Sequence, residues 1–425
     1  MQVNNVAWVE CKFIDDRMDS SSYITQINMG LFDIYKKEST DFQIKTLDDI
    51  CNKIIDGPFG SDILEEDYVE QGVPFIRVQN ITEYGFEDSN LVFISEKANK
   101  RIIRSECRPG DLVFTKTGRL GTVCVLNNEY SNYNIRGDLA KLQLKSHIDP
   151  YYVMSYLNSN FGTKITNSYS SGSTRGRILI SNIKKIFTPI PSPEIQKYIG
   201  DKVRKAEELR EEAKRLKKEA EEILSEKLNV KELLLKINKY TEKHNWINDS
   251  DINDRMDALY YNPQKTIIRR FYKKYDLRKL NTLVDYKKGF AFKSEDYCHS
   301  STNTFLLRVS DISNNEVNMD NMIKLSDKFY QEYIDFNLFN EDIVMVVTGN
   351  TTGKSVIINN SKSKLLLNQN AIRMRLKDGT NVSTYYIELI LQSQYFQTLL
   401  KYSLYQSVQP FISMEFLNEV KIPII

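Results

Sequence analysis

The sequence predicts an α+β protein with two similar mixed α/β domains that are separated by a long coiled-coil-type helix. Three observations lead to this prediction: short β-like runs bounded by turn residues, one long charged stretch with heptad periodicity, and a series of motifs that occurs twice in the same order. A chain of 425 residues suggests two or three domains. We place a first domain at residues 1–192, the helix at 193–240 and a second domain at 241–425.

The central helix is predicted from Pro193 to about Leu228. Alternating spacings of 3 and 4 give a heptad seam, with alanine at one core position and leucine or isoleucine at the other: Ala206, Leu209, Ala213, Leu216, Ala220 and Ile223. Almost every other position is Lys, Arg or Glu and favours water. The alternative is a solvated linker, but small core residues favour a paired helix. Roughly 35 residues would span about 50 Å.

The two sides of this helix repeat each other. Asp16-Arg17-Met18-Asp19 recurs 238 residues later as Asp254-Arg255-Met256-Asp257, and Trp8 and Trp246 are separated by the same 238 residues. Further pairs recur in the same order at offsets of 231 to 234: Arg77 with Arg308, Asp111 with Asp342, and Tyr151 with Tyr385. Ordered repeats with a drifting offset indicate loop insertions between equivalent domains. The sequence therefore predicts a tandem duplication with a period far above that of solenoid repeats.

The elements of the first domain follow one another in an order typical of a mixed fold. A helical patch is expected near residues 15–40, and a helix is expected at Pro150–Asn158 with Asp149 as its N-cap. Short runs bounded by Gly, Pro, Asn or Asp are typical of strands joined by turns, and they occur at 73–78, 91–94, 111–115, 122–126, 139–144 and 186–190. The second domain repeats this order after Trp246.

Composition is that of a soluble globular protein. The net charge is only +2, so any nucleic-acid contact must come from a local basic face. The N-terminus lacks the charged start and apolar core of a signal peptide, and no run of 18 apolar residues occurs. The five cysteines form no Cys-x-x-Cys pair and there are three histidines. We therefore expect no disulfide framework, no structural zinc site and a cytoplasmic location.

The sequence predicts no catalytic centre in this chain. Gly349–Ser355 resembles a phosphate-cradling loop, but three residues rather than four separate its glycines, and a strand-like run follows its lysine. The equivalent loop Thr117–Thr122 has no lysine. We find no Asn-Pro-Pro-Tyr/Phe methyltransferase loop and no arrangement of His, Ser and Asp or of paired carboxylates that favours hydrolysis.

Several motifs recur in a fixed order across nearly the whole chain: the paired Asp-Arg-Met-Asp starts, Gly57-Pro58-Phe59-Gly60-Ser61, Ile76-Arg77-Val78 with Leu307-Arg308-Val309, Gly110-Asp111-Leu112-Val113 with Thr117-Gly118-x-x-Gly121, and the exit Ile190–Gln196 into the helix. This layout resembles the specificity subunit of a type I restriction-modification system, a form of phage defence. The resemblance implies two tandem target-recognition domains and a non-catalytic, sequence-specific DNA-binding subunit. It also implies methyltransferase (M) and restriction (R) subunits as partners. S-adenosylmethionine, Mg²⁺ and ATP are then expected in those partners.

The sequence departs from the family pattern after Ile425, where a second conserved helix is expected. In the family the two helices pair antiparallel, which matches the alanine seam. Three sources of this helix remain open: another copy of the chain, a methyltransferase subunit or a longer parent chain.

Two similar domains joined by a rod-like helix suggest a protein that contacts two half-sites of DNA at a fixed separation. One turn of DNA is about 34–36 Å, so a rod near 50 Å would set half-sites on the order of one to one and a half turns apart. Because the two halves differ in sequence, we expect an asymmetric and interrupted site.

The candidate DNA contacts are polar residues on loops. Lys, Arg and free backbone N–H groups contact phosphates, and Arg, Lys, Asn and Gln read bases. The candidates are Gly60, Ser61, Lys116, Arg119, Arg175 and Arg177 in the first domain, and Asn350, Lys354, Gln406 and Gln409 in the second. A solvated surface charge is the alternative for each arginine. We expect Arg77 and Arg308 to be structural ion-pair partners, and the Asp-Arg-Met-Asp motifs to form a helix-start network.

Three functions remain open from the sequence. The first is a DNA-specificity subunit that directs methyltransferase and restriction subunits to their site. The second is the recognition part of a fused restriction-methylation enzyme. The third is a protein-interaction adaptor that binds no DNA, which the near-neutral charge supports.

Overall fold

The computed structural model describes residues 42–170, 176–240, 246–247, 252, 261–298, 302–313, 316–319, 322–359, 363–404 and 410–425. The chain divides into two compact units, Met1–Lys214 (unit 1) and Arg215–Ile425 (unit 2). The expected helical patch near residues 15–40, Trp8 and both Asp-Arg-Met-Asp motifs lie outside the described residues. Within the described ranges, no helix combines the length and the hydropathy that a bilayer span requires.

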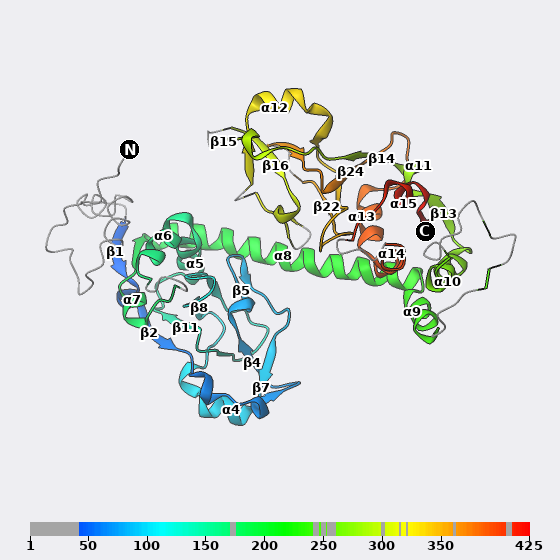
Figure 1. Cartoon of the computed structure of the whole chain (residues 1–425). Coiled ribbons are helices and arrows are strands. Elements are labelled where there is room, and N and C mark those ends of the chain that lie inside the picture. The colour runs from blue at the N-terminus through cyan, green and yellow to red at the C-terminus, as the bar shows by residue number, and fades with distance from the viewer. Residues whose placement is uncertain are drawn as a thin grey trace. The chain divides into compact units, whose positions relative to one another are not determined.

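Unit 1 contains two four-stranded sheets (Figure 1). The main sheet is antiparallel with the order β2-β11-β8-β9: Cys51–Asp56, Leu139–Leu144, Leu112–Thr115 and Val123–Val125. The second sheet is mixed with the order β10-β4-β7-β3: Asn134–Ile135, Val73–Ile76, Val92–Ile94 and Tyr68–Val69. A small hairpin joins β5 to β6: Ile81–Thr82 and Gly85–Phe86. The expected strand runs are confirmed to within a few residues.

Strand β8 is buried along its whole length because both faces of the main sheet are covered. Side chains alternate between the faces of a strand. Leu112 and Phe114 pack in one core with residues of the helices α5, α6 and α7: Pro150–Asn158, Asn160–Ser168 and Ile180–Lys184. Val113 faces the other way and packs with Ile76 and Ile135 of the second sheet. This strand therefore joins the two cores of unit 1.

Local capping signals fix the helices of unit 1. The Asp149 side chain accepts hydrogen bonds from the backbone N–H groups of Tyr151 (2.9 Å) and Tyr152 (3.1 Å), so the expected N-cap of α5 is confirmed. Thr46 and Asp49 form a reciprocal capping box on the short helix α3 (Leu47–Ile50). The remaining elements are β1, β12 and α4: Phe42–Thr46, Phe187–Pro191 and Glu96–Arg101. Strands β1 and β12 pair antiparallel, so the beginning and end of the described domain are held together.

Unit 2 repeats this topology. Its main sheet has the order β14-β24-β21-β22: Val284–Lys288, Ala371–Leu376, Ile343–Val346 and Ser355–Ile357. Its second sheet has the order β15-β19-β16-β23-β20: Tyr297–Cys298, Ile323–Leu325, Thr304–Leu307, Lys364–Leu367 and Asn337–Leu338. The first order reproduces β2-β11-β8-β9, and β15-β19-β16-β23 reproduces β3-β7-β4-β10. The predicted tandem duplication is confirmed.

The smaller elements of unit 2 also have counterparts in unit 1. Strands β13 and β25 pair as β1 and β12 do, and β17 and β18 form the small hairpin: Asp276–Lys279, Lys421–Ile424, Ile312–Ser313 and Glu316–Val317. The helices α11, α12, α13, α14 and α15 follow the order of α3 to α7: Leu280–Leu283, Asp327–Glu332, Thr384–Gln392, Gln394–Lys401 and Met414–Glu419. Helix α10 (Pro263–Tyr272) precedes β13.

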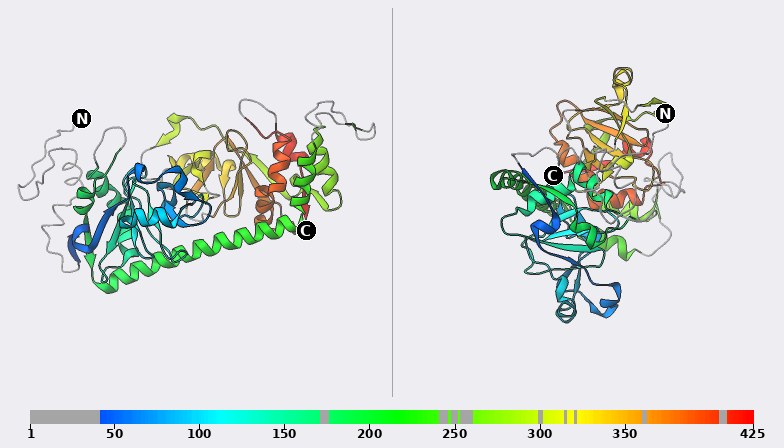
Figure 2. Two further views of the ribbon diagram at one scale, coloured as in Figure 1. Left: turned by 90° about the horizontal axis from the view of Figure 1, so that it is seen from below. Right: turned by 90° about the vertical axis from the view of Figure 1, so that its left-hand side faces the viewer.

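The long helix α8 spans Pro193–Lys227, which confirms the predicted helix (Figures 1 and 2). Its 35 residues correspond to about 52 Å. Asn229, in the left-handed conformation at φ 49°, ends it, and the Tyr275 hydroxyl donates to the Lys227 carbonyl at 2.9 Å. A second helix, α9 (Val230–Lys239), follows and buries Leu233 and Ile237 in the core of unit 2. The segment 193–240 is thus two helices.

Candidate nucleic-acid interface

Several loops of unit 1 meet where β2 and β8 end and β11 begins. The chain after β8 lies between the other loops, because the Lys116 N–H donates to the Asp138 carbonyl (2.9 Å) and the Ile178 N–H donates to the Lys116 carbonyl (3.1 Å). Thr117 and Arg177 form an antiparallel bridge. The structure therefore brings together two of the predicted contacts, Lys116 and Arg177, from segments about 60 residues apart.

Lys116 is 1% exposed, and its ammonium group pairs with the carboxylate of Asp56 at the end of β2. Burial, with a smaller contribution from the positive charge of Arg177, lowers the pKa of Lys116 to about 8. The Asp138 carboxylate acts in the opposite direction. In this conformation Lys116 positions the loop ends, and Arg177 is the exposed cation beside it.

The Gly57–Ser61 loop packs against the chain before β11. The Gly57 N–H donates to the Leu139 carbonyl at 3.1 Å, and a Cβ atom on Gly57 would lie 2.2 Å from the Arg136 carbonyl oxygen. Only glycine permits this approach. Gly60 and Ser61 are exposed, with open space around Gly60, and Phe59 is 77% exposed. The loop tip thus presents backbone and one aromatic ring to solvent.

Arg119 lies in a tight turn between β8 and β9. Gly118 and Gly121 have φ values of 74° and 80°, which favour glycine. A Cβ atom on Gly121 would also lie 2.4 Å from the Thr166 Cγ2 atom of α6. The turn is thereby fixed against α6, and the exposed side chain of Arg119 extends from it.

The equivalent loops of unit 2 have different chemistry. The strand register places Lys288 at the position of Asp56, and Val347 follows β21 where Lys116 follows β8. The loop before β24 is Asn368-Gln369-Asn370, and the Asn370 carbonyl accepts the N–H groups of Val347 (2.9 Å) and Thr348 (3.3 Å). A cleft of 490 Å³ opens here, lined in part by Lys288, Thr348 and Phe411.

Asn350 and Lys354 lie in the turn between β21 and β22, and both are exposed. The turn is held by the Gly349 N–H, which donates to the Pro410 carbonyl at 3.3 Å, and by the Thr352 hydroxyl, which donates to the same carbonyl at 3.1 Å. Lys354 lines a polar groove of 680 Å³ with Glu221 of α8. Strand β22 follows Lys354, so the loop is not followed by the helix that a nucleotide-binding loop needs.

Three predicted contacts, Arg175, Gln406 and Gln409, lie outside the described residues. The described predicted contacts of unit 1 are on neighbouring loops, and those of unit 2 are in one turn. Sequence reasoning missed Asp56, Phe59, Arg136 and Lys288. For Arg136 a signal was present, because Arg136-Gly137-Asp138 precedes Leu139 as Asn368-Gln369-Asn370 precedes Ala371.

Two repeated motifs have structural roles. Arg308 forms an ion pair with Asp311 at 2.9 Å, as predicted. For Arg77 the ion-pair prediction is wrong: Asn80 stands where Asp311 stands in unit 2, and the Arg77 guanidinium donates to the Asn90 carbonyl instead.

The second motif is the aspartate before the strands β8 and β21. Asp111 pairs with Lys141 at 3.0 Å, and Asp342 pairs with Arg375 through contacts of 2.6 and 2.7 Å. Both carboxylates are buried, so this repeated aspartate stabilises the scaffold of each unit.

Comparison with known proteins identifies the scaffold. The family model described as "Type I restriction modification DNA specificity domain" matches residues 39–222 and 272–424, well over half of the chain. The chain belongs to this family. The matched ranges fall one on each half of the duplication, so the protein carries two specificity domains.

Individual relatives are distant. The specificity subunit of the type I restriction enzyme EcoBI from Escherichia coli is 25% identical over 170 residues, which is 40% of this chain and 35% of that protein. The chain thus matches about a third of the length of this relative. The S subunit from M. genitalium has 13% identity and a TM-score of 0.40, over 92% of this chain and 86% of that one. The HsdS subunit from Thermoanaerobacter tengcongensis has 13% identity and a TM-score of 0.31, over 91% and 85%.

Proposed function

We propose that this chain is the DNA-specificity subunit of a type I restriction-modification system, in which each domain reads one half of an asymmetric, interrupted site. The observation that carries the proposal is a repeated scaffold with different side chains at the same loop positions. Asp56 in unit 1 corresponds to Lys288 in unit 2, and Arg136 to Asn368. Base readout depends on the donors and acceptors that side chains present in the groove. Two loop sets of different chemistry therefore read different half-sites.

The proposed contacts are the exposed members of these loops. In unit 1 they are Gly60, Ser61, Arg119 and Arg177, joined by Phe59 and Arg136; in unit 2 they are Asn350 and Lys354, joined by Lys288. Arg175, Gln406 and Gln409 remain proposals from the sequence. Lys116 is assigned a positioning role, because its ammonium group is buried against Asp56.

The proposal assigns the seam of α8 to a partner helix. Leu209, Leu216 and Ile223 recur every seven residues and are 53%, 49% and 52% exposed. Such a row costs free energy in water and is typical of a helix–helix interface. We propose that methyltransferase subunits and, through them, restriction subunits assemble on a cytoplasmic complex built around this helix. Catalysis, with S-adenosylmethionine, Mg²⁺ and ATP, belongs to those partners.

Methylation sequencing tests the proposal directly. DNA from a host that carries the neighbouring methyltransferase gene is compared with and without the gene for this chain. We expect an interrupted, asymmetric motif that disappears with the gene and whose gap gives the half-site spacing. An unchanged methylome, with the methyltransferase shown to be active, would refute the proposal and favour a protein-interaction adaptor.

Loop variants then test the assignment of one domain to each half-site. Arg136→Ala is expected to relax the motif in one half only, and Lys288→Ala in the other half only. Lys328→Ala, an exposed lysine on α12, is the matched control and is expected to leave the motif unchanged. If both loop variants alter the same half, the assignment is wrong.

A further inference from the structure

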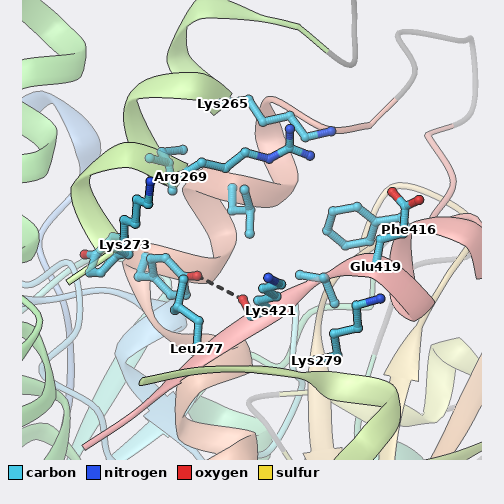
Figure 3. A pocket seen from close by; sticks show the side chains of 13 residues that line it. Lys265, Arg269, Lys273, Leu277, Lys279, Phe416, Glu419 and Lys421 are labelled. Atoms are coloured by element: carbon cyan, nitrogen blue, oxygen red, sulfur yellow. Dashed lines mark hydrogen bonds between the residues drawn. The ribbon is translucent and has the colours of Figure 1, made fainter. Parts of the chain in front are cut away.

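A basic pocket of 440 Å³ lies in unit 2, apart from the loops described above. It is enclosed by α10, the strands β13 and β25, and the helices α14 and α15 (Figure 3). Its apolar part is formed by aromatic and aliphatic side chains that include Tyr272, Tyr395 and Phe416. Its charged part contains five cations and a single carboxylate, Glu419: Lys265, Arg269, Lys273, Lys279 and Lys421. The pocket therefore combines an apolar floor with a positive rim.

The strand pair β13–β25 places two of these lysines directly opposite each other, Lys279 against Lys421. Like charges at opposite positions of an antiparallel pair are destabilising. Both residues are exposed, and neither forms an ion pair among the described residues. The strand pair thus carries an electrostatic cost that an anionic partner would relieve.

The same position in unit 1 is uncharged. Thr46 and Phe187 are opposite each other in β1–β12, where Lys279 and Lys421 are opposite each other in β13–β25. The scaffold does not need two lysines here, because its other copy folds without them. The positive charge is therefore a feature of unit 2 and not of the fold.

Two tyrosines form part of the apolar wall of the pocket. Tyr272 lines the pocket and is 1% exposed, and its hydroxyl has no hydrogen-bond partner among the described residues. The neighbouring Tyr395, by contrast, donates to the Lys421 carbonyl at 3.1 Å. A buried polar group without a partner is costly, and this hydroxyl is enclosed in the wall of the pocket.

The distribution of charge selects the class of ligand. In Figure 3 the side chains of Lys265 and Arg269 lie on one side of the pocket and those of Lys279 and Lys421 lie on the opposite side. One phosphate group needs donors that converge on a single point, whereas these cations are separated by the apolar floor. Lys265 and Arg269 also contact other residues of the chain, so the positive charge that matters most is that of Lys273, Lys279 and Lys421.

We propose that this pocket binds an acidic segment of a partner protein, with one aromatic or aliphatic side chain on the apolar floor and flanking carboxylates at the lysines. Apolar anchors with charged surroundings are typical of protein recognition sites. A duplex DNA backbone, which presents phosphates on a convex polar surface, would leave the floor unfilled. This inference does not depend on the DNA-specificity role, and it concerns a different surface.

The test uses a phage-displayed library of random 12-residue peptides, selected on the full chain and counter-selected on the double variant Lys279→Glu, Lys421→Glu. We expect enrichment of peptides with an aromatic or aliphatic residue flanked by Asp or Glu. Fluorescence polarisation of an enriched peptide is expected to show at least tenfold weaker binding to the double variant. Replacing the apolar anchor of the peptide by serine is expected to weaken binding to a similar extent.

Lys328→Glu is the matched control, because it makes the same charge change on an exposed lysine of the same unit. Binding within twofold of the wild type is expected, and equal melting temperatures show that all variants are folded. The proposal is overturned if no acidic motif is enriched, or if the double variant binds the peptide as the wild type does. It is also overturned if a 20-base-pair duplex displaces the peptide and binds the double variant more weakly, since the pocket would then contact DNA.

Discussion

Replacing Asp111 or Asp342 by asparagine tests what the repeated buried carboxylate contributes to each domain. Asp342 is 1% exposed and contacts Arg375 at 2.6 and 2.7 Å. Asp111 is 7% exposed and contacts Lys141 at 3.0 Å. Each also accepts one backbone N–H group, at 2.7 Å for Asp342 and 2.8 Å for Asp111. Asparagine preserves the size of the side chain and that backbone acceptor, so the substitution removes chiefly the negative charge.

The free-energy cost of each substitution depends on the cation that loses its partner. Removing one partner of a buried ion pair costs about 3–5 kcal/mol, because the other charge stays buried without compensation. The Lys141 side chain is 9% exposed and would keep its hydrogen bond to the Glu106 carbonyl (2.7 Å) but lose its carboxylate partner, whereas the Arg375 side chain is 35% exposed and can be hydrated. We therefore expect about 4 kcal/mol for Asp111→Asn and about 2 kcal/mol for Asp342→Asn. The shorter contacts of Arg375 do not reverse this order.

Hydrogen exchange followed by mass spectrometry measures the two domains separately. Asp111→Asn should speed exchange in β8, and Asp342→Asn should speed exchange in β21. A difference of about 2 kcal/mol corresponds to roughly 30-fold in the opening equilibrium. As a control, Asp342→Asn combined with Arg375→Met keeps the backbone acceptor and removes the unpaired cation, so it should restore protection toward that of the wild type. If Asp342→Asn speeds exchange in β21 as much as Asp111→Asn speeds exchange in β8, or more, the reasoning is refuted.

Three further predictions concern other parts of the chain. Burial raises the pKa of Glu207 from 4.5 to about 7. Between these two pH values the carboxyl group is protonated in the folded chain and ionised in the unfolded chain. The free energy of unfolding therefore falls as pH rises through this range. Glu207→Gln should make the free energy of unfolding less dependent on pH in this range. It should raise the melting temperature at pH 8 by roughly 2–4 °C, and the melting temperature at pH 5 is the reference. Phe59→Ala should weaken binding to the cognate duplex by about 1.5–3 kcal/mol without changing the melting temperature, because its ring is 77% exposed in the free protein and would be buried against the DNA. Unchanged anisotropy titrations would exclude this contact. The double variant Leu209→Glu, Leu216→Glu should abolish co-purification of the methyltransferase subunit. Leu235→Glu changes another exposed leucine and should preserve co-purification. If the subunit co-purifies with both variants, the seam is not part of the interface.

Much of the fold was predictable because its signals are local. The heptad spacing of α8 and the Asp149 cap of α5 each depend on residues within a few turns of one helix. The duplication was visible because the order of motifs persists through loop insertions. The end of the long helix near Leu228 was predicted, but the separate helix α9 was not, because charged and apolar residues continue in a helical pattern through residue 239. The left-handed conformation of Asn229 and its contact with Tyr275 separate the two helices.

The site was less predictable because its geometry depends on pairs that are distant in sequence. Lys116 and Arg119 occupy one turn and looked equivalent, yet Asp56, which is 60 residues away, holds Lys116 inside. Arg77 and Arg308 occupy equivalent positions, but one neighbour is Asn80 and the other is Asp311. In both cases the role of the residue depends on its partner, which the local sequence does not reveal.

The two copies differ at two kinds of position, and the two kinds require different explanations. Differences at loop positions, such as Asp56 against Lys288, are expected when two domains of one scaffold read different bases. The exchange of Thr46 and Phe187 for Lys279 and Lys421 lies in a strand pair, where like charges oppose each other at a cost to stability. An anionic partner outside the domain would offset that cost. According to the proposal, the basic pocket of unit 2 makes this contact, so a chain with its two specificity domains exchanged should carry the contact to the new position of unit 2.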